Sequence, residues 1–296
     1  MAIDRTTKGA LLALAAATMW GVSGAVAGGV FDVVSPARVT QSRALIAVVF
    51  LVPYAAHRGV LRLEGGFWKF ALLGLNLAVV NVTFFWALEA LGVGPGATIQ
   101  FLAPILVLGW MAVVHKTRVR PLVWVAAVAA VIGVGLVTQA WMLESSDAFG
   151  VISGLASAVA FATYLLYGEH LGKTYKPAQI AAWGFVFEAA LWLIVLQIWT
   201  FPTDIGAAAW RDLLIIGTLG TAVPFIAGFA ALRLASSGVV GVVATAEPAI
   251  AAIAAALMLG QALGPVQWLG VAVVVVAVAT VQRLGLPDTH PTSSIA

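Results

Sequence analysis

The segment Gly94-Val-Gly-Pro-Gly-Ala-Thr-Ile-Gln-Phe-Leu-Ala-Pro104 decides the fold, because the chain repeats its landmarks further on. From Pro104 the sequence continues through an apolar stretch to Pro121-Leu-Val-Trp124. A shift of 144 positions, from 94 to 238, carries these landmarks onto Gly238-Val-Val-Gly241, Glu247-Pro248 and Pro265-Val-Gln-Trp268. Landmarks that keep their spacing over such a length indicate an internal duplication, which is typical of membrane transporters.

Composition places the whole chain in a membrane. Hydrophobic residues make up 62% of the sequence and charged residues only 9%, with a mean hydropathy of +1.06. A soluble domain of this size could not cover its surface with so few charges. Apolar runs near twenty residues recur along the chain, and each could cross roughly 30 Å of hydrocarbon as a helix. The fold class predicted is all-α integral membrane.

Ten transmembrane helices are predicted, and the short segments between them carry Pro, Gly, Ser and Asp. The predicted ranges are 8–29, 36–57, 67–89, 94–115, 121–142, 149–170, 177–200, 211–233, 236–260 and 265–284.

Lysine and arginine are distributed unequally between the two ends of these helices. One side of the membrane would carry Arg5, Lys8, Arg58, Arg62, Lys69, Lys116, Arg118, Arg120, Lys173, Lys176, Arg233 and Arg283. The opposite side would carry only Arg38 and Arg211. Because basic loops stay in the cytoplasm, both termini are predicted to lie inside.

The duplication divides the chain into two five-helix repeats. Residues 9–20 resemble residues 150–161, a shift of 141 positions from 9 to 150. The domains predicted are a first repeat at 1–145, a second repeat at 146–284 and a cytoplasmic tail at 285–296. Five spans is an odd number, so the second repeat must enter the membrane inverted.

The motifs in this order resemble the drug/metabolite transporter superfamily, in its ten-helix EamA-type branch. They are Gly9-Ala-Leu-Leu-Ala-Leu-Ala, Trp20-Gly21, the Arg43-Ala-Leu-Ile-Ala stretch, Ala-Leu-Glu-Ala-Leu91, Ala103-Pro104, Glu247-Pro248 and Gln267-Trp-Leu-Gly270. The resemblance covers nearly the whole chain and implies two inverted repeats around a central cavity. Within the branch, the pattern is similar to bacterial exporters of aromatic amino acids.

Polar and aromatic residues recur at one-face spacing on the helices other than 121–142 and 265–284. The repeat also carries the face of Gln100 and Ala103 onto Ala244 and Glu247. The substrate-binding residues predicted are Trp20, Ser23, Asn76, Thr83, Trp86, Gln100, Phe161, Tyr164, Thr221, Phe225 and Glu247. Pro104 and Pro248 are predicted as hinges.

Several of these residues have a second interpretation. Glu247 could recognise a substrate ammonium, bind a proton or form a hydrogen bond across helices. Arg43 could meet a substrate carboxylate, but a structural pair with Asp32, Glu89 or Glu188 is favoured. Asn76, Asn81 and Gln100 could simply tie helices together, and membrane tryptophans are often interfacial anchors.

Several function classes are excluded or disfavoured by absent residues. The chain has no cysteine, and its four histidines, His57, His115, His170 and His290, lie at helix ends or in the tail. No metal site, cofactor or catalytic residue is therefore predicted, and the chain is not expected to be an enzyme. The basic residues are scattered over short loops, which disfavours a nucleic-acid partner.

The function predicted is a bacterial inner-membrane exporter of small metabolites that works by alternating access. Its partners would be an amino acid, most favourably aromatic or otherwise apolar, and the membrane lipids, with the monomer as the functional unit. The low charge expected in the cavity favours binding by stacking and hydrogen bonds over ion pairs. Nucleotide sugars or drugs stay as alternative substrates, and a non-transporting scaffold as an alternative class.

Overall fold

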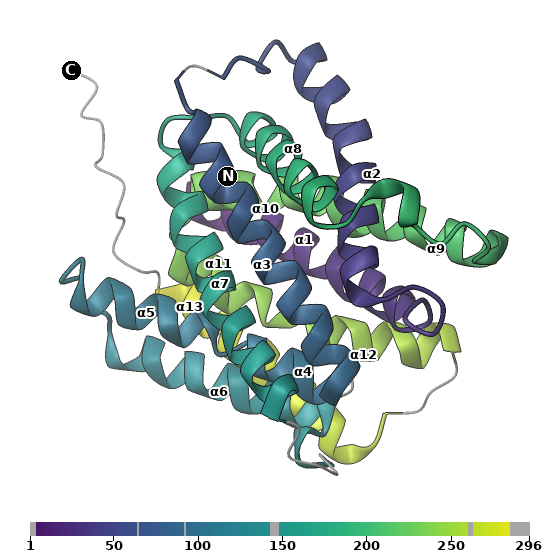
Figure 1. The fold of residues 1–296 in the computed structure, drawn as a ribbon. Helices are drawn as coiled ribbons and strands as arrows, with labels where there is room; N and C mark the ends of the chain where they lie inside the picture. Colours follow the sequence, from purple (N-terminus) through teal and green to yellow (C-terminus); the bar gives the residue numbers. More distant parts are fainter. Residues whose placement is uncertain (1–3, 64, 92, 143–147, 260–262, 285–296) are drawn as a thin grey trace.

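The computed structural model describes residues 4–63, 65–91, 93–142, 148–259 and 263–284, and this part of the chain is helical, without strands (Figure 1). In order, the α-helices are α1 (Arg5–Gly28), α2 (Pro36–His57), α3 (Phe67–Leu91), α4 (Val93–Gln100), α5 (Ala103–Val113), α6 (Pro121–Thr138), α7 (Ala148–Gly172), α8 (Pro177–Val195), α9 (Gly206–Gly217), α10 (Val223–Leu234), α11 (Ser237–Ala244), α12 (Ala246–Leu259) and α13 (Pro265–Leu284). Two short 3-10 turns, η1 (Ala140–Met142) and η2 (Ile198–Thr200), and a π-helical turn, η3 (Thr218–Ala222), lie between them. The predicted tail at 285–296 and the repeat boundary at 145–146 fall outside the described residues.

Seven helical stretches of the described chain are long and apolar enough to cross a membrane. They are Pro36–His57, Phe67–Leu91, Gly96–Val113, Pro121–Thr138, Ala148–Gly172, Pro177–Val195 and Gly206–Leu234. The prediction of an all-helical, multi-pass membrane protein is therefore confirmed at this level.

Local sequence explains where the helices begin. Pro36, Pro121 and Pro177 are the first residues of α2, α6 and α8. Proline suits this position because its ring presets the helical φ and its missing N–H would have had no partner there. At the start of α1 the Asp4 carboxylate accepts the backbone N–H of Thr7 at 2.9 Å, which is an N-cap.

Prolines also divide two of the predicted spans. The range 94–115 separates at residues 101–102 into α4 and α5, and the range 236–260 separates at Thr245 into α11 and α12. Pro104 and Pro248 lie directly after these breaks, where the missing N–H leaves a carbonyl of the preceding turn without its helical donor. Since α4 ends at residue 100 and α11 at residue 244, the two breaks are again 144 positions apart.

The range 211–233 contains the π-helical turn η3 between α9 and α10. Pro224 is the second residue of α10 and cannot donate to the carbonyl of Gly220 four residues earlier. A single π-turn inside a helix of this kind is frequent at functional sites. The Gly220 carbonyl is therefore free for a partner from another helix.

Equivalent residues of the two halves make the same close contact. A Cβ atom on Gly9 of α1 would lie 2.7 Å from the Cβ of Ala235, at the end of α10. A Cβ atom on Gly150 of α7 would lie 2.6 Å from Leu91, at the end of α3. Gly150 corresponds to Gly9 and Ala235 to Leu91 under the sequence repeat. Each half thus packs its first helix onto the third span of the other half.

Helices α6 and α13 pack closely on each other at the edge of the bundle (Figure 1). A Cβ atom on Gly270 would lie 2.7 Å from the carbonyl oxygen of Gly133, so the two backbones are in contact there. The remaining helices surround the centre of the molecule, where the candidate site lies.

Candidate functional site

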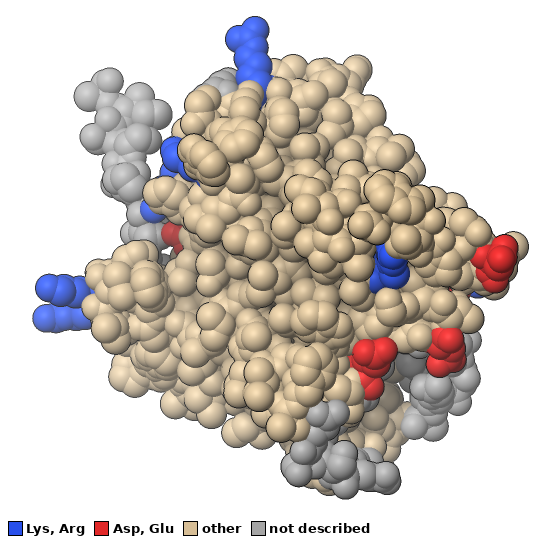
Figure 2. Space-filling view, in the orientation of Figure 1, with Lys and Arg blue, Asp and Glu red and all other residues tan. Residues whose placement is uncertain are grey.

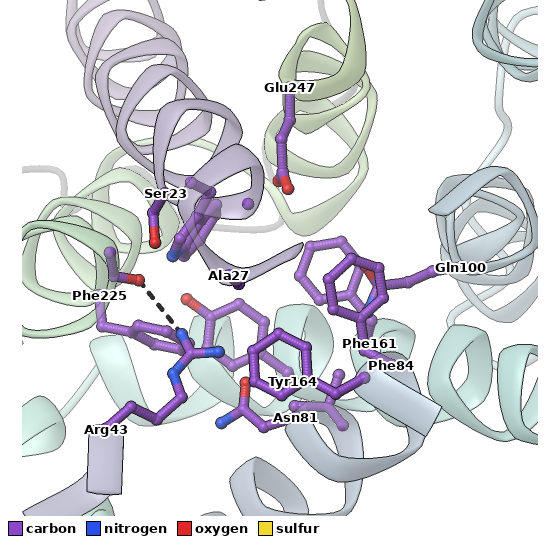
Figure 3. Close-up of a pocket in the computed structure, with 15 residues that line it drawn as sticks. Ser23, Ala27, Arg43, Asn81, Phe84, Gln100, Phe161, Tyr164, Phe225 and Glu247 are labelled. Atoms are coloured by element: carbon purple, nitrogen blue, oxygen red, sulfur yellow. Dashed lines mark hydrogen bonds between the residues drawn. The ribbon is translucent and has the colours of Figure 1, made fainter. Parts of the chain in front are cut away.

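A cavity of about 70 Å³ lies among helices of both halves (Figure 3). Its lining is Trp20, Ser23, Gly24, Ala27, Arg43, Val80, Asn81, Phe84, Phe85, Gln100, Phe161, Tyr164, Gly220, Phe225 and Glu247. This is well below the roughly 300–1,000 Å³ of a typical small-molecule site. The helices must therefore separate before a metabolite can occupy the cavity.

Aromatic rings form the apolar part of the lining. The rings of Trp20 and Phe225 meet edge to face at a centroid distance of 5.2 Å. The rings of Phe161 and Tyr164 are stacked at 5.7 Å, and Tyr164 meets Phe225 edge to face at 5.6 Å. Trp20 belongs to the first half and the other three to the second, so the aromatic cluster joins the halves. Such a surface suits an apolar or aromatic group.

Arg43 on α2 is the buried cation of this site, with a side chain only 6% exposed. Its Nε donates to Thr221 Oγ1 at 2.9 Å, and its Nη2 donates to the Gly220 carbonyl at 3.2 Å. Its guanidinium also lies over the ring of Phe85, at 5.3 Å from the centroid. The Gly220 carbonyl is the group left without a helical donor by Pro224.

The favoured prediction for Arg43, a structural ion pair with Asp32, Glu89 or Glu188, is wrong. Among the described residues the only ion pair within 4 Å is Arg211–Asp212, on the surface. The π-turn supplies neutral oxygens instead, which the sequence pattern did not reveal.

Glu247 is the second residue of α12 and enters the cavity from the side opposite Arg43 (Figure 3). The break at Thr245 places it at the start of a helix, where the positive end of the helix dipole favours a carboxylate. The carboxylate makes no hydrogen bond to any described residue. It is half-buried and its acceptor sites are free for a ligand.

Two amides of the lining are held by residues behind them. Asn81 Nδ2 donates to Glu188 Oε1 at 3.0 Å, and Gln100 Nε2 donates to Ser157 Oγ at 2.7 Å. Ser157 in turn donates to the Val80 carbonyl at 3.3 Å. Because each amide uses its NH₂ group in this way, each keeps its oxygen as an acceptor.

Seven of the predicted substrate-binding residues lie together in the lining. They are Trp20, Ser23, Gln100, Phe161, Tyr164, Phe225 and Glu247.

The other four predicted residues lie elsewhere. Asn76 donates to the Ala160 carbonyl of α7 at 3.1 Å, and Thr83 donates to the Val79 carbonyl of its own helix at 2.6 Å. Trp86 packs against Phe149, with ring centroids 5.7 Å apart. Thr221 is fully buried beneath Arg43 and holds it from behind. The face of α3 that lines the cavity is therefore the one beside the predicted stripe, and it carries Asn81 and Phe84.

The residues that prediction missed are mainly on that face of α3. Val80, Asn81, Phe84 and Phe85 line the cavity there, together with Gly24, Ala27, Arg43 and Gly220 from other elements. Asn81 and Phe84–Phe85 have the same helical spacing as the predicted stripe, so periodicity alone did not distinguish the two faces.

Larger hollows lie on the outside of the bundle. One of about 690 Å³ runs between α3 and α7 and is lined by exposed apolar residues such as Leu72, Val79 and Ile152. In a membrane protein this surface faces lipid, so we assign the candidate site to the smaller central cavity. The described residues contain no group of three or more His, Asp or Glu that could hold a metal ion.

Comparison with known proteins matches both halves of the chain to one family. The sequence pattern of the EamA-like transporter family matches residues 7–139 and again residues 148–282. A solved crystal structure shares the fold, with a TM-score of 0.78 over 94% of this chain and 99% of the other, at 18% identity.

Three curated relatives are transporters. An uncharacterized inner membrane transporter of Salmonella typhimurium, YicL, is 28% identical over 64% of this chain and 66% of its own length. An uncharacterized transporter of Bacillus subtilis, YwfM, is 25% identical over 92% of both chains. The threonine/homoserine exporter RhtA of Escherichia coli K12 is 24% identical over 69% of this chain and 67% of its own length.

Proposed function

The chain belongs to the EamA-like transporter family, and from this premise we propose that it exports small metabolites, namely aromatic and other apolar amino acids, by alternating access. The observation that carries the substrate class is the central cavity, where aromatic rings from both halves surround a few polar groups. Members of a transporter family are not expected to be enzymes, and we assign no catalytic residue.

We propose ten membrane spans in two inverted repeats, 1–145 and 146–284, with a tail at 285–296. The family pattern matches once in each half, and the helix breaks recur 144 positions apart. The exchanged contacts of Gly9 with Ala235 and of Gly150 with Leu91 are those of a two-fold relationship between the halves. With five spans in each half, that two-fold axis lies in the membrane plane.

The proposed orientation has both termini in the cytoplasm of a bacterial cell, across its inner membrane. Arg5 donates to the Arg233 carbonyl at 2.8 Å and Arg120 to the Leu284 carbonyl at 3.4 Å, so the basic ends of distant helices meet. On the face that Figure 2 shows, lysine and arginine lie mainly at the top and left of the molecule, and aspartate and glutamate lie mainly at the right and lower right. A basic face of this kind favours the cytoplasmic side.

The alternatives are supported less well by the site. A nucleotide sugar or sugar phosphate would need several cations for its phosphates, whereas Arg43 is the one Lys or Arg in the lining. A lipophilic cationic drug would leave the buried charge of Arg43 opposed to it. A scaffold would not need a cavity lined by aromatic rings and by five charged or polar side chains, Ser23, Arg43, Asn81, Gln100 and Glu247. RhtA, which exports threonine and homoserine, also favours an amino acid as substrate.

The proposal is tested with purified protein in proteoliposomes. We expect counterflow of labelled phenylalanine, tryptophan, leucine and methionine, with threonine as the comparison substrate. Because the chain has no cysteine, single variants Trp20→Cys, Gln100→Cys and Tyr164→Cys can report on water access to the cavity. Failure of every amino acid while another metabolite moves would make the substrate class wrong. Cavity cysteines that never react with an aqueous thiol reagent would favour the scaffold.

A further inference from the structure

Two opposite charges face the central cavity from different helices, and neither has a counter-ion within 4 Å in the part of the chain that the structure describes. Figure 3 shows the Arg43 guanidinium and the Glu247 carboxylate entering from opposite sides, with aromatic rings between them. Among the described residues, no ion pair of 4 Å or less includes either of them. A charge in the membrane interior is costly when it faces lipid, so a charged side chain at this depth indicates a function or a partner.

Arg43 keeps donors available for a ligand. Its guanidinium carries five N–H groups, of which one on Nε and one on Nη2 are used by Thr221 and Gly220. Those two bonds hold the side chain from behind and leave Nη1 for the cavity. A fixed guanidinium with free N–H groups suits a carboxylate.

Acceptors gather around the cavity as well. Glu247 has no hydrogen-bond donor among the described residues. Asn81 and Gln100 give their NH₂ groups to Glu188 and Ser157, so both present an oxygen. An ammonium group, with three N–H donors, matches a carboxylate together with amide oxygens.

We propose that Arg43 binds the carboxylate and Glu247 the ammonium group of a single amino acid, and that this pair selects zwitterions over amines and over acids. The inference rests on the proposed amino-acid transport and identifies the side chains that bind the carboxylate and the ammonium group of the substrate. It differs from the sequence-based expectation, which favoured stacking and hydrogen bonds over ion pairs. The substrate side chain then lies against Trp20, Phe161 and Phe225.

The test measures competition against labelled phenylalanine in counterflow, with two analogues that each lack one charge. Phenethylamine has no carboxylate, and 3-phenylpropionate has no ammonium group. For the natural protein we expect both analogues to compete at least about tenfold more weakly than phenylalanine, since a hydrogen bond to a charged group contributes about 1.5–3 kcal/mol.

Each variant should remove the preference of the protein for phenylalanine over one of the two analogues. In Glu247→Gln we expect phenylalanine to bind about tenfold more weakly while 3-phenylpropionate is unchanged. In Arg43→Gln we expect the same loss for phenylalanine while phenethylamine is unchanged, and Arg43→Lys should retain part of the preference. Glu89→Gln and Arg211→Gln, at exposed positions, are the matched controls.

The outcomes separate this inference from the proposed function. If the natural protein moves no amino acid, the proposed function itself fails. If it moves phenylalanine but accepts the amine or the acid equally well, the zwitterion pair is wrong. The same holds if the competition ratios of Glu247→Gln and Arg43→Gln equal those of the controls. Ligand-induced thermal stabilisation gives the same ratios for any variant too slow for counterflow.

Discussion

Arg43 Nε donates a 2.9 Å hydrogen bond to Thr221 Oγ1, and this bond fastens α2 of the first half to the π-turn of the second. Thr221 is fully buried and donates its own proton to the Ile216 carbonyl at 2.6 Å. The threonine hydroxyl thus serves both a buried cation and a helix whose regular bonding is interrupted. The arginine, the π-turn and Pro224 form one local unit.

Thr221→Val should destabilise the protein, because it leaves a buried guanidinium N–H without an acceptor. We expect a loss of about 1.5–3 kcal/mol in the free energy of unfolding. Thr218→Val is the control from the same turn, since Thr218 only donates to the Leu214 carbonyl of its own helix. The measurement is reversible unfolding in mixed detergent micelles. Equal effects of the two variants would contradict the role given to Thr221.

Gly270→Ala should separate α6 from α13. The new Cβ would lie 2.7 Å from the Gly133 carbonyl oxygen, which is a backbone atom and cannot turn away. Overpacking of this kind costs typically about 1–3 kcal/mol. Gly135→Ala is the control on α6, because its Cβ would meet Thr98 at an ordinary 3.8 Å. Both are compared by thermal unfolding, and a Gly270→Ala protein as stable as the control would contradict the close contact.

Asn81 and Glu188 should show coupled effects on stability. Glu188 is completely buried, and Asn81 donates to its Oε1, while Oε2 has no hydrogen-bond partner. Asn81→Leu alone leaves the carboxyl unpaired and should cost about 1–3 kcal/mol. We expect the double variant with Glu188→Leu to lose less than the sum of the single variants by at least about 0.5 kcal/mol.

The matched cycle pairs Glu188→Leu with Asn76→Leu, which lies on the same helix but bonds to Ala160 of α7. Its effects should be additive within about 0.5 kcal/mol. Coupling of the same size in both cycles would mean that the Asn81–Glu188 bond is not responsible.

Sequence reasoning was most successful where the cause is local. Prolines at helix starts and at the breaks near Pro104 and Pro248 act through their own missing N–H group, which is visible in the sequence. The partner of Arg43 was not visible, because it is a carbonyl freed by Pro224 on a helix distant in the sequence. On α3 two faces have the same helical spacing, and the packing of α3 against α7 and α8 places Asn81 at the cavity, which the sequence alone does not show.

The proposed orientation predicts which exposed side chains an impermeant thiol reagent can reach in intact cells. Asp204→Cys and Arg211→Cys should react from outside, because these exposed positions belong to the acidic side. Lys116→Cys and Lys173→Cys, also exposed, should react only after the membrane is opened. Because the natural chain has no cysteine, it serves as the control for background labelling. The reverse pattern of labelling would invert the topology.

A disulfide between α5 and α11 should hold the protein in the described state. A Cβ atom on Gly241 would lie 3.7 Å from the Cβ of Pro104, which is within the range of about 3.5–4.5 Å that a disulfide needs. The two residues come from opposite halves and lie on the cytoplasmic side of the cavity in the proposed orientation. Pro104→Cys/Gly241→Cys should therefore lose transport on oxidation and recover it on reduction, measured by counterflow.

The sequence repeat carries this pair onto Pro248 and Ala97, so alternating access predicts that these residues approach each other when the opposite side closes. Oxidised Pro248→Cys/Ala97→Cys should also block transport, but with the cysteine at position 100 protected from the outside rather than from the inside. Each single-cysteine variant controls for the loss of its proline or small residue. If the oxidised Pro104→Cys/Gly241→Cys protein transports at the rate of its reduced form, these two helices do not separate during the cycle, and access to the cavity must open between other helices.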